Sequence, residues 1–281
     1  MFIRHHLHTS HGFISTADHA ESLGANFYQI FLGSPQRYYS PRRLPKDLIE
    51  LKNKLLTKNI KIVVHASFML NFCNPIESKI HKEAVRLLSN DLLDSTLLGA
   101  IGVVVHMGKR LNLTEEQATR NYVSGIKKVL QATPCKSTII LETGAGQGSE
   151  ICTFLHDLSR LYKMFTASER QRIKFCIDTC HVYAAGYDIG YPLYVDVFCA
   201  LVEDLLGWGN VVCIHLNDSK KMAGAKKDQH ADIGKGYIEI DGLKKFVKVC
   251  VNKDIPIVLE TPCENGIRKI EQLNMIKSWF D

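Results

Sequence analysis

The stretch Ile173-Lys174-Phe175-Cys176-Ile177-Asp178-Thr179-Cys180-His181 joins a short apolar run to two side chains that bind metal ions. The run from Ile173 to Ile177 is typical of a buried strand, and it ends in the carboxylate of Asp178. The imidazole of His181 follows three residues later. A strand that brings a carboxylate and an imidazole into one loop indicates a functional site at its carboxyl end.

Similar apolar runs recur along the whole chain and predict eight strands. They lie at residues 2–7, 26–32, 60–65, 102–106, 138–142, 173–178, 211–215 and 255–260. The runs are rich in Val, Ile and Phe and almost continuously apolar, as expected of parallel strands that are buried on both faces.

Segments with helical periodicity lie between these runs. Apolar residues recur every three or four positions in residues 46–56, 79–98, 196–206 and 241–251, and Thr114 with Gln117 forms a capping-box pattern. Strand and helix alternating about eight times is the pattern of a (β/α)₈ barrel, which has about 250 residues. A doubly wound open sheet usually has a Gly-rich loop after its first strand, and none follows Leu7. We therefore predict an α/β fold with one domain, a TIM barrel over residues 1–281 with its active site at the C-terminal face of the strands.

Composition limits the class of protein. The chain has 281 residues, of which 46% are hydrophobic and 23% charged, with a net charge of +6. No apolar run reaches the roughly 18 residues of a membrane helix, and the N-terminus lacks the apolar region of a signal peptide. Nine scattered cysteines without a CxxC pair favour a reducing compartment and argue against a zinc ribbon. We expect a protein without membrane contact that works inside the cell, with the cytoplasm, the nucleus and a viral origin all left open.

Six of the predicted strands end in a residue that can bind a metal ion: His65, His106, Glu142, Asp178, His215 and Glu260. Three more such residues lie just beyond strand ends: His181, Asp228 and His230. The carboxyl ends of barrel strands converge on one face, so these side chains should meet there. Burying four carboxylates together is strongly unfavourable unless cations compensate them. Histidine with carboxylate suits Zn²⁺ and admits Mn²⁺ or Fe²⁺, and nine ligands indicate three ions.

The other histidines are expected to have lesser roles. Those at the first strand and its loop should be supporting or structural: His5, His6, His8 and His11. Those on predicted helices should lie at the surface or at the edge of the core: His19, His81 and His156.

Several long motifs resemble one known family, the endonuclease IV family of abasic-site (AP) endonucleases, over essentially the whole chain. The most specific is Cys176-Ile177-Asp178-Thr179-Cys180-His181, which runs into Ala184-Ala185-Gly186-Tyr187-Asp188. The others are His215-Leu216-Asn217-Asp218-Ser219-Lys220, Asp228-Gln229-His230 with Ile233-Gly234-Lys235-Gly236, Leu141-Glu142 with Ala145-Gly146-Gln147-Gly148, and Leu259-Glu260-Thr261-Pro262. Departures occur at Ala66-Ser67-Phe68-Met69, Met107-Gly108 and Glu142-Thr143-Gly144.

This resemblance implies three zinc ions, with Mn²⁺ in place of some of them as an alternative. It assigns His65, His106 and Glu142 to the first ion. It assigns Glu142, Asp178, His215 and Glu260 to the second, with Glu142 bridging the pair, and it assigns His181, Asp228 and His230 to the third.

The same resemblance implies a DNA repair endonuclease that hydrolyses the phosphodiester 5′ to an abasic site in duplex DNA. The products would be a 3′-hydroxyl and a 5′-deoxyribose phosphate, with Glu142 and Glu260 as the catalytic carboxylates. Its partner would be double-stranded DNA containing abasic sites, and we expect a monomer.

Candidate DNA contacts are of two kinds. The resemblance suggests three side chains that wedge into the base stack: Arg37, Phe68 and Met69. Four lysines near Asp228 are candidate phosphate contacts: Lys220, Lys221, Lys226 and Lys227. Ordinary loop packing and solvated lysines are the alternatives for both groups.

Three rival functions fit parts of the pattern. A metal-dependent sugar or sugar-phosphate isomerase or epimerase could use the same barrel, because fold does not determine function. It would need one or two metal ions, and His181, Asp228 and His230 would then have no task. A non-catalytic DNA-binding protein and a phosphoesterase for small molecules are the other two.

Overall fold

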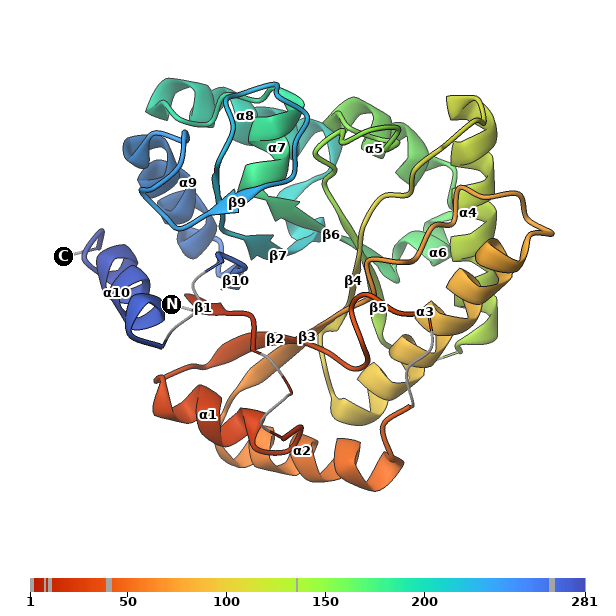
Figure 1. Cartoon of the computed structure of the whole chain (residues 1–281), viewed down its shortest axis with the longest axis horizontal. Coiled ribbons are helices and arrows are strands. Elements are labelled where there is room, and N and C mark those ends of the chain that lie inside the picture. Colours follow the sequence, from red (N-terminus) through yellow and green to blue (C-terminus); the bar gives the residue numbers. More distant parts are fainter. Residues whose placement is uncertain are drawn as a thin grey trace.

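The computed structural model describes residues 3–7, 9, 12–38, 42–134, 136–262 and 266–280. At its centre is one sheet of eight strands in the order β1-β10-β7-β6-β5-β4-β3-β2, and all neighbouring strands in this order run parallel. A further parallel bridge between His6, directly after β1, and Gln29 of β2 closes the sheet into a barrel (Figure 1). The predicted TIM barrel is confirmed.

All eight predicted strands are present; β5, β6 and β7 have the predicted bounds, and the ends of the others shift by one or two residues. They are β1 (Ile3–His5), β2 (Phe27–Phe31), β3 (Lys61–His65), β4 (Gly102–Val105), β5 (Thr138–Glu142), β6 (Ile173–Asp178), β7 (Val211–His215) and β10 (Ile257–Leu259). His106 and Glu260 therefore follow their strands by one residue, and the predicted start at Phe2 lies outside the described residues.

Helices surround the barrel, as Figure 1 shows. They are α1 (Thr16–Ser22), α2 (Pro45–Thr57), α3 (Lys79–Leu98), α4 (Glu115–Ala132), α5 (Leu155–Lys163), α6 (Ala167–Arg170), α8 (Pro192–Leu205), α9 (Ile240–Asn252) and α10 (Gly266–Lys277), with the short 3₁₀ helix η1 (Trp208–Asn210). The predicted capping box at Thr114 and Gln117 is present and begins α4. Among the described helices, none combines the length and the apolar character that crossing a bilayer requires.

The interior of the barrel is filled by an apolar layer below the carboxyl face. Seven strands each contribute one fully buried side chain to it: Phe27, Val63, Val104, Ile140, Cys176, Cys213 and Val258. Because this layer is packed, the barrel is closed from below, and chemistry is confined to the strand ends above it.

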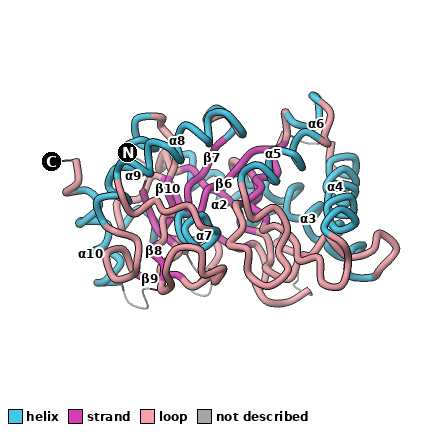
Figure 2. The backbone as a smooth tube through the Cα atoms, turned by 90° about the horizontal axis from the view of Figure 1, so that it is seen from above, coloured by secondary structure: helices cyan, strands magenta, loops and turns pink. Residues whose placement is uncertain are grey.

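The loops gather on one side of the barrel, together with three small elements (Figure 2). These are the helix α7 (Thr179–Ala185) and the antiparallel pair β8 (Asp218–Ser219) and β9 (His230–Ala231). None of the three is predictable from the sequence pattern, because each is too short to show a periodicity. All three carry or adjoin candidate metal ligands.

Candidate metal centre

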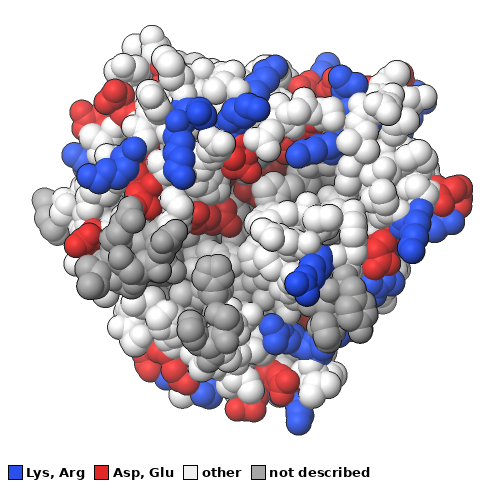
Figure 3. Space-filling view, in the orientation of Figure 1, with Lys and Arg blue, Asp and Glu red and all other residues white. Residues whose placement is uncertain are grey.

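The nine candidate ligands lie together at the carboxyl ends of the barrel strands. Each of the five imidazoles has a nitrogen between 2.8 and 3.5 Å from a carboxylate oxygen of the set, and these contacts connect all nine residues. Figure 3 shows acidic side chains inside a hollow near the centre of this face, with Lys and Arg side chains around it.

Glu142 is the central carboxylate of the set. Its Oε2 lies 3.4 Å from Nε2 of His65 and 3.4 Å from Nε2 of His106. Its Oε1 lies 2.8 Å from Nδ1 of His215. The two oxygens of Glu142 therefore face two different groups of ligands.

His215 lies among three carboxylates. Its Nδ1 is 3.1 Å from Oε2 of Glu260 and 3.9 Å from Oδ2 of Asp178, in addition to the contact with Glu142. Three carboxylates around one neutral nitrogen would repel one another, so this arrangement suits a cation.

Asp228 connects two further imidazoles. Its Oδ1 lies 3.2 Å from Nε2 of His181 and 3.2 Å from Nε2 of His230. The Nε2 of His230 is also 3.5 Å from Oδ2 of Asp178. Asp178 thus lies between the ligands around His215 and those around Asp228.

Four buried polar atoms of the set have no hydrogen-bonding partner among the described residues: Nε2 of His65, His181 and His230, and Oε2 of Glu142. The opposite ring nitrogen of each imidazole is bound. Nδ1 of His65 donates to the Ala66 carbonyl at 2.7 Å, and Nδ1 of His181 donates to the Thr143 carbonyl at 2.8 Å. Since the proton is on Nδ1, the lone pair of Nε2 points into the shared space. This donor set fits zinc.

The protein alone compensates the charges of this site by perturbing its pKa values. Burial would raise the pKa of Glu142, but His106, His215 and His65 outweigh it and hold that pKa well below the usual value. Burial lowers the pKa of His106 to about 4. For His230, the carboxylates of Asp178 and Asp228 overcome the effect of burial and raise the pKa to about 9. The ionised carboxylates next to the protonated imidazole of His230 are the metal-free counterpart of carboxylates next to a metal ion.

The Asp178–His181 pair is held by the start of α7. Asp178 is the N-cap of this helix, and its Oδ1 accepts a hydrogen bond from the His181 backbone nitrogen at 2.9 Å. Its Oδ2 accepts from Nδ2 of Asn217 at 2.7 Å. The cap explains the three-residue spacing, because an N-cap side chain binds the nitrogen two or three residues ahead.

Asp218, within the same motif as His215, organises a loop and contacts no candidate ligand in the contacts described. Its carboxylate accepts hydrogen bonds from the backbone nitrogens of Ser219, Gly234, Gly236 and Ile238, at 2.7 to 3.0 Å. Since β8 pairs with β9, this carboxylate stabilises the segment that carries His230.

Two polar residues of the site, Gln29 and Asn217, are not among the residues predicted from the sequence. Gln29 is fully buried on β2 and contacts His215 and Glu260. Asn217 binds Asp178, and its Oδ1 accepts from the Glu260 backbone nitrogen at 2.9 Å. A signal for Gln29 existed, because it is the one amide side chain in the otherwise apolar run of residues 27–32.

Phe68 lies at the opening of the site, and Met69 follows it in the same loop. They are 51% and 38% exposed, respectively. The Phe68 ring makes edge contacts with the rings of His65 and His106, at centroid distances of 5.3 and 5.4 Å. Phe68 also lines a cavity of about 190 Å³ together with His106, His181 and Asp228.

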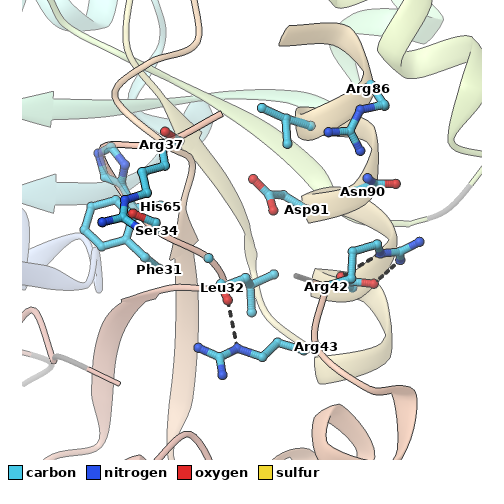
Figure 4. Close-up of a pocket in the computed structure, with 14 residues that line it drawn as sticks. Phe31, Leu32, Ser34, Arg37, Arg42, Arg43, His65, Arg86, Asn90 and Asp91 are labelled. Carbon is cyan, nitrogen blue, oxygen red and sulfur yellow. Dashed lines mark hydrogen bonds and ion pairs between the residues drawn. The ribbon is translucent and has the colours of Figure 1, made fainter. Parts of the chain in front are cut away.

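Arg37 lines a separate, smaller pocket, which we name the arginine pocket: Arg37, Arg42, Arg43, Arg86, His65, Asp91 and neighbouring residues. In Figure 4, Arg37 extends beside Phe31 and His65, and Asp91 projects into the pocket from α3. Arg42 pairs with Asp94, and Arg43 donates to the Leu32 carbonyl at 2.8 Å. Arg42 and Arg43 are thus used within the fold.

The four lysines are exposed in the segment between β8 and β9: Lys220, Lys221, Lys226 and Lys227. Backbone hydrogen bonds hold this segment, from Lys220 to Gln229 at 2.8 Å and from Lys226 to Ala184 at 3.0 Å. Their side chains are therefore presented from a fixed backbone.

The expectations for the other histidines have mixed outcomes. His19 and His156 are exposed, as expected, whereas the prediction for His81 is wrong. His81 is fully buried, because the loop before α3 covers it and the carbonyls of Phe72 and Asn74 accept from its Nδ1. His8, His11 and the side chain of His5 lie outside the described residues.

Comparisons with known proteins agree with this architecture. Residues 17–279 match the family described as xylose isomerase-like TIM barrel. A protein of Acanthamoeba polyphaga mimivirus that is named an endonuclease 4 is 39% identical over 290 residues, which cover 99% of this chain and 93% of that protein. The crystal structure of endonuclease IV from Thermus thermophilus matches with a TM-score of 0.86 at 27% identity, over 100% of this chain and 99% of that one. A D-tagatose 3-epimerase-like protein has a TM-score of 0.76 at 16% identity, over 100% and 97% of the two chains, and this likeness shows the fold alone.

Proposed function

This chain belongs to the endonuclease IV family of AP endonucleases, and from that premise we propose that it incises duplex DNA 5′ to an abasic site. The products would be a 3′-hydroxyl and a 5′-deoxyribose phosphate. The observation that carries the proposal is the connected set of nine ligands, in which four buried polar atoms have no hydrogen-bonding partner among the described residues.

Three zinc ions are the proposed cofactors, with Mn²⁺ as an alternative in part. His65, His106 and Glu142 would hold the first ion, and His181, Asp228 and His230 the third. Glu142, Asp178, His215 and Glu260 would hold the second. The separate contacts of the two Glu142 oxygens support a bridging role.

Bound zinc ions would supply a nucleophile at neutral pH and compensate the charge at phosphorus. The protein must then orient the attacking water and accept its proton. The side chain of Glu260 is 15% exposed, whereas that of Glu142 is 0% exposed. This difference in access favours Glu260 as the proton acceptor and leaves Glu142 to hold the metal ions and orient the water.

Recognition of the substrate is proposed for the exposed side chains around the opening. An abasic nucleotide is easier to extrude from the duplex than a normal one, because it lacks base stacking. Phe68 lies over the ligands His65 and His106, where it could fill the gap left in the stack together with its exposed neighbour Met69. Arg37 lines the pocket that His65 also lines. Lys220, Lys221, Lys226 and Lys227 would contact phosphates.

We also propose that the barrel acts as a single catalytic domain and as a monomer inside the cell. The seven cysteines that the structure describes are all free thiols, which supports a reducing compartment. Size-exclusion chromatography with light scattering would test the monomer, and a mass of two chains would contradict it.

The proposal is tested with a duplex that contains one tetrahydrofuran abasic analogue. We expect a single cut on its 5′ side, no cut in the matched undamaged duplex, and loss of cutting when a chelator removes the metal. Metal analysis should give about three zinc ions per chain. One or two ions together with no cutting would favour the sugar isomerase or epimerase alternative.

A further inference from the structure

Gln29 is a buried amide inside the barrel, on a strand that carries no candidate metal ligand. It lies on β2, between Tyr28 and Ile30, and it is 0% exposed. Its Nε2 donates to Oε1 of Glu260 at 2.6 Å, and its Oε1 lies 2.9 Å from Nε2 of His215. One side chain thus contacts two ligands from two other strands.

The orientation of the amide follows from its partners. The Glu260 carboxylate can only accept hydrogen bonds, so the NH₂ group of Gln29 must face Glu260. The carbonyl oxygen of Gln29 then faces His215, and an oxygen without hydrogen requires a donor. His215 therefore carries a proton on Nε2.

His215 differs in this respect from three other candidate ligands. His65, His181 and His230 donate Nδ1–H to the main-chain carbonyls of Ala66, Thr143 and Glu260, and each turns Nε2 towards a carboxylate. His215 turns Nδ1 towards Glu142 and Glu260. Its outer nitrogen is bound by a side chain, that of Gln29.

We propose that Gln29 is a positioning residue of the metal centre. It holds His215 in the Nε2–H tautomer, so that Nδ1 is the metal-binding nitrogen. Gln29 also binds Oε1 of Glu260. The other oxygen of Glu260, Oε2, then faces Nδ1 of His215 at 3.1 Å. This inference rests on the proposed metal centre and adds a residue that none of the ligand motifs contains.

The first experiment measures the unmodified protein and uses a variant only to assign signals. Nitrogen-15 NMR of the histidine rings in the zinc-loaded protein distinguishes a metal-bound nitrogen from a protonated one, and His215→Gln identifies the signals of His215. We expect His215 to show a protonated Nε2 and a metal-bound Nδ1, and the reverse pattern for His65, His181 and His230. A His215 with a metal-bound Nε2 would overturn the proposal.

The second experiment measures zinc retention against a competing chelator. Gln29→Met keeps the approximate size of the side chain but removes the amide contacts with Glu260, His215 and His6. We expect a 10- to 100-fold weaker affinity for one of the zinc ions, as is usual for groups that orient ligands. Gln29→Glu keeps the acceptor for His215 and replaces the donor to Glu260 with a charge. Gln29→Glu should preserve the His215 tautomer while weakening zinc binding. This variant also tests the proposal if Gln29→Met does not fold.

Tyr28→Phe is the matched control. It changes the residue next to Gln29 and removes a buried contact of 3.0 Å between the hydroxyl groups of Tyr28 and Thr16. It should retain zinc like the unmodified protein. If Gln29→Met retained zinc as well as the unmodified protein does, the proposed role of Gln29 would be overturned, but the proposed metal centre would not. A native protein that takes up no zinc would instead overturn the proposed metal centre.

Discussion

The floor and the rim of the site differ in how their side chains are held. The floor consists of the nine candidate ligands: His65, His106, Glu142, Asp178, His181, His215, Asp228, His230 and Glu260. The rim consists of the exposed candidates for DNA contact: Arg37, Phe68, Met69, Lys220, Lys221, Lys226 and Lys227. Floor side chains are largely buried, and their hydrogen bonds are made by atoms that point away from the space between the nine ligands. Rim side chains extend from loops into solvent. The floor is therefore rigid enough for chemistry, and the rim can adapt to a large substrate.

The two regions also treat buried carboxylates differently. On the floor, histidines overcome the effect of burial and lower the pKa of Asp228 and Glu260. In the arginine pocket beside the rim, burial and the neighbouring Asp94 raise the pKa of Asp91 to about 7. At Asp178, also on the floor, burial outweighs the neighbouring histidines and raises the pKa, so the direction at each carboxylate depends on how strongly its cationic partners oppose burial.

Removal of the metal should have the largest effect and should be confined to the floor. Without the metal ions the proposed nucleophile is lost, so incision should fall to background. The Tm should also fall by several degrees, since ions that bind only the folded state stabilise it. Calorimetry and cutting assays before and after addition of zinc would measure both. An active chelated protein would contradict a catalytic floor.

Glu260→Gln should have the next largest effect. The amide keeps the shape of the side chain but cannot accept a proton, and loss of a general base costs about 10²- to 10⁴-fold in rate. DNA affinity should stay within a factor of a few, because the rim is unchanged. Single-turnover cutting and fluorescence anisotropy measure the two quantities separately. Near-normal turnover would remove Glu260 from the mechanism.

Phe68→Ala tests the rim. Loss of a ring that stacks on bases costs about 1–3 kcal/mol, so affinity for abasic DNA should fall by about 10-fold or more while zinc content is unchanged. Phe280→Ala removes another partly exposed ring, far along the chain from Phe68, and should have no effect. If Phe68→Ala loses zinc instead, its ring belongs to the floor.

Replacing Lys220 and Lys221 with Gln should have a smaller, salt-dependent effect. Each lost phosphate contact lowers the slope of log affinity against log salt by about 0.9. Titrations at several salt concentrations measure that slope. Lys253→Gln is the control, because Lys253 directly follows α9 and lies before β10, at the opposite end of the barrel. An unchanged slope in the double variant would mean that the two lysines contact solvent and not phosphates.

The smallest expected effect concerns Asp91. Its pKa in the folded state, about 7, exceeds the usual value of 3.8, so the folded protein holds a proton that the unfolded chain releases. Stability is therefore lost as the pH rises from about 4 through 7. Asp91→Asn should raise the Tm at pH 8 by a few degrees and should change it little at pH 4. Calorimetry at both pH values measures this, and equal shifts at both would contradict the ionisation of Asp91.

Short local patterns explain which features were predictable. The strand from Ile173 to Asp178 has the predicted bounds, because a buried parallel strand shows itself as a continuous apolar run. Helix α7 was missed, since its seven residues are all buried and show no amphipathic period. His81 was misplaced for a related reason: its helix is amphipathic, but a loop covers its first turn.

By itself, the sequence determined the eight strands, their parallel arrangement and the residue types at their ends, because apolar runs and their terminal residues are local properties of the chain. Only the tertiary structure decided which atoms face one another. Closure of the barrel at His6 and Gln29 brings β2 next to β1, so that Gln29 reaches His215 and Glu260, residues that are 186 and 231 positions away in the chain. Such contacts depend on strand register and on closure of the sheet, which no single segment of the sequence contains.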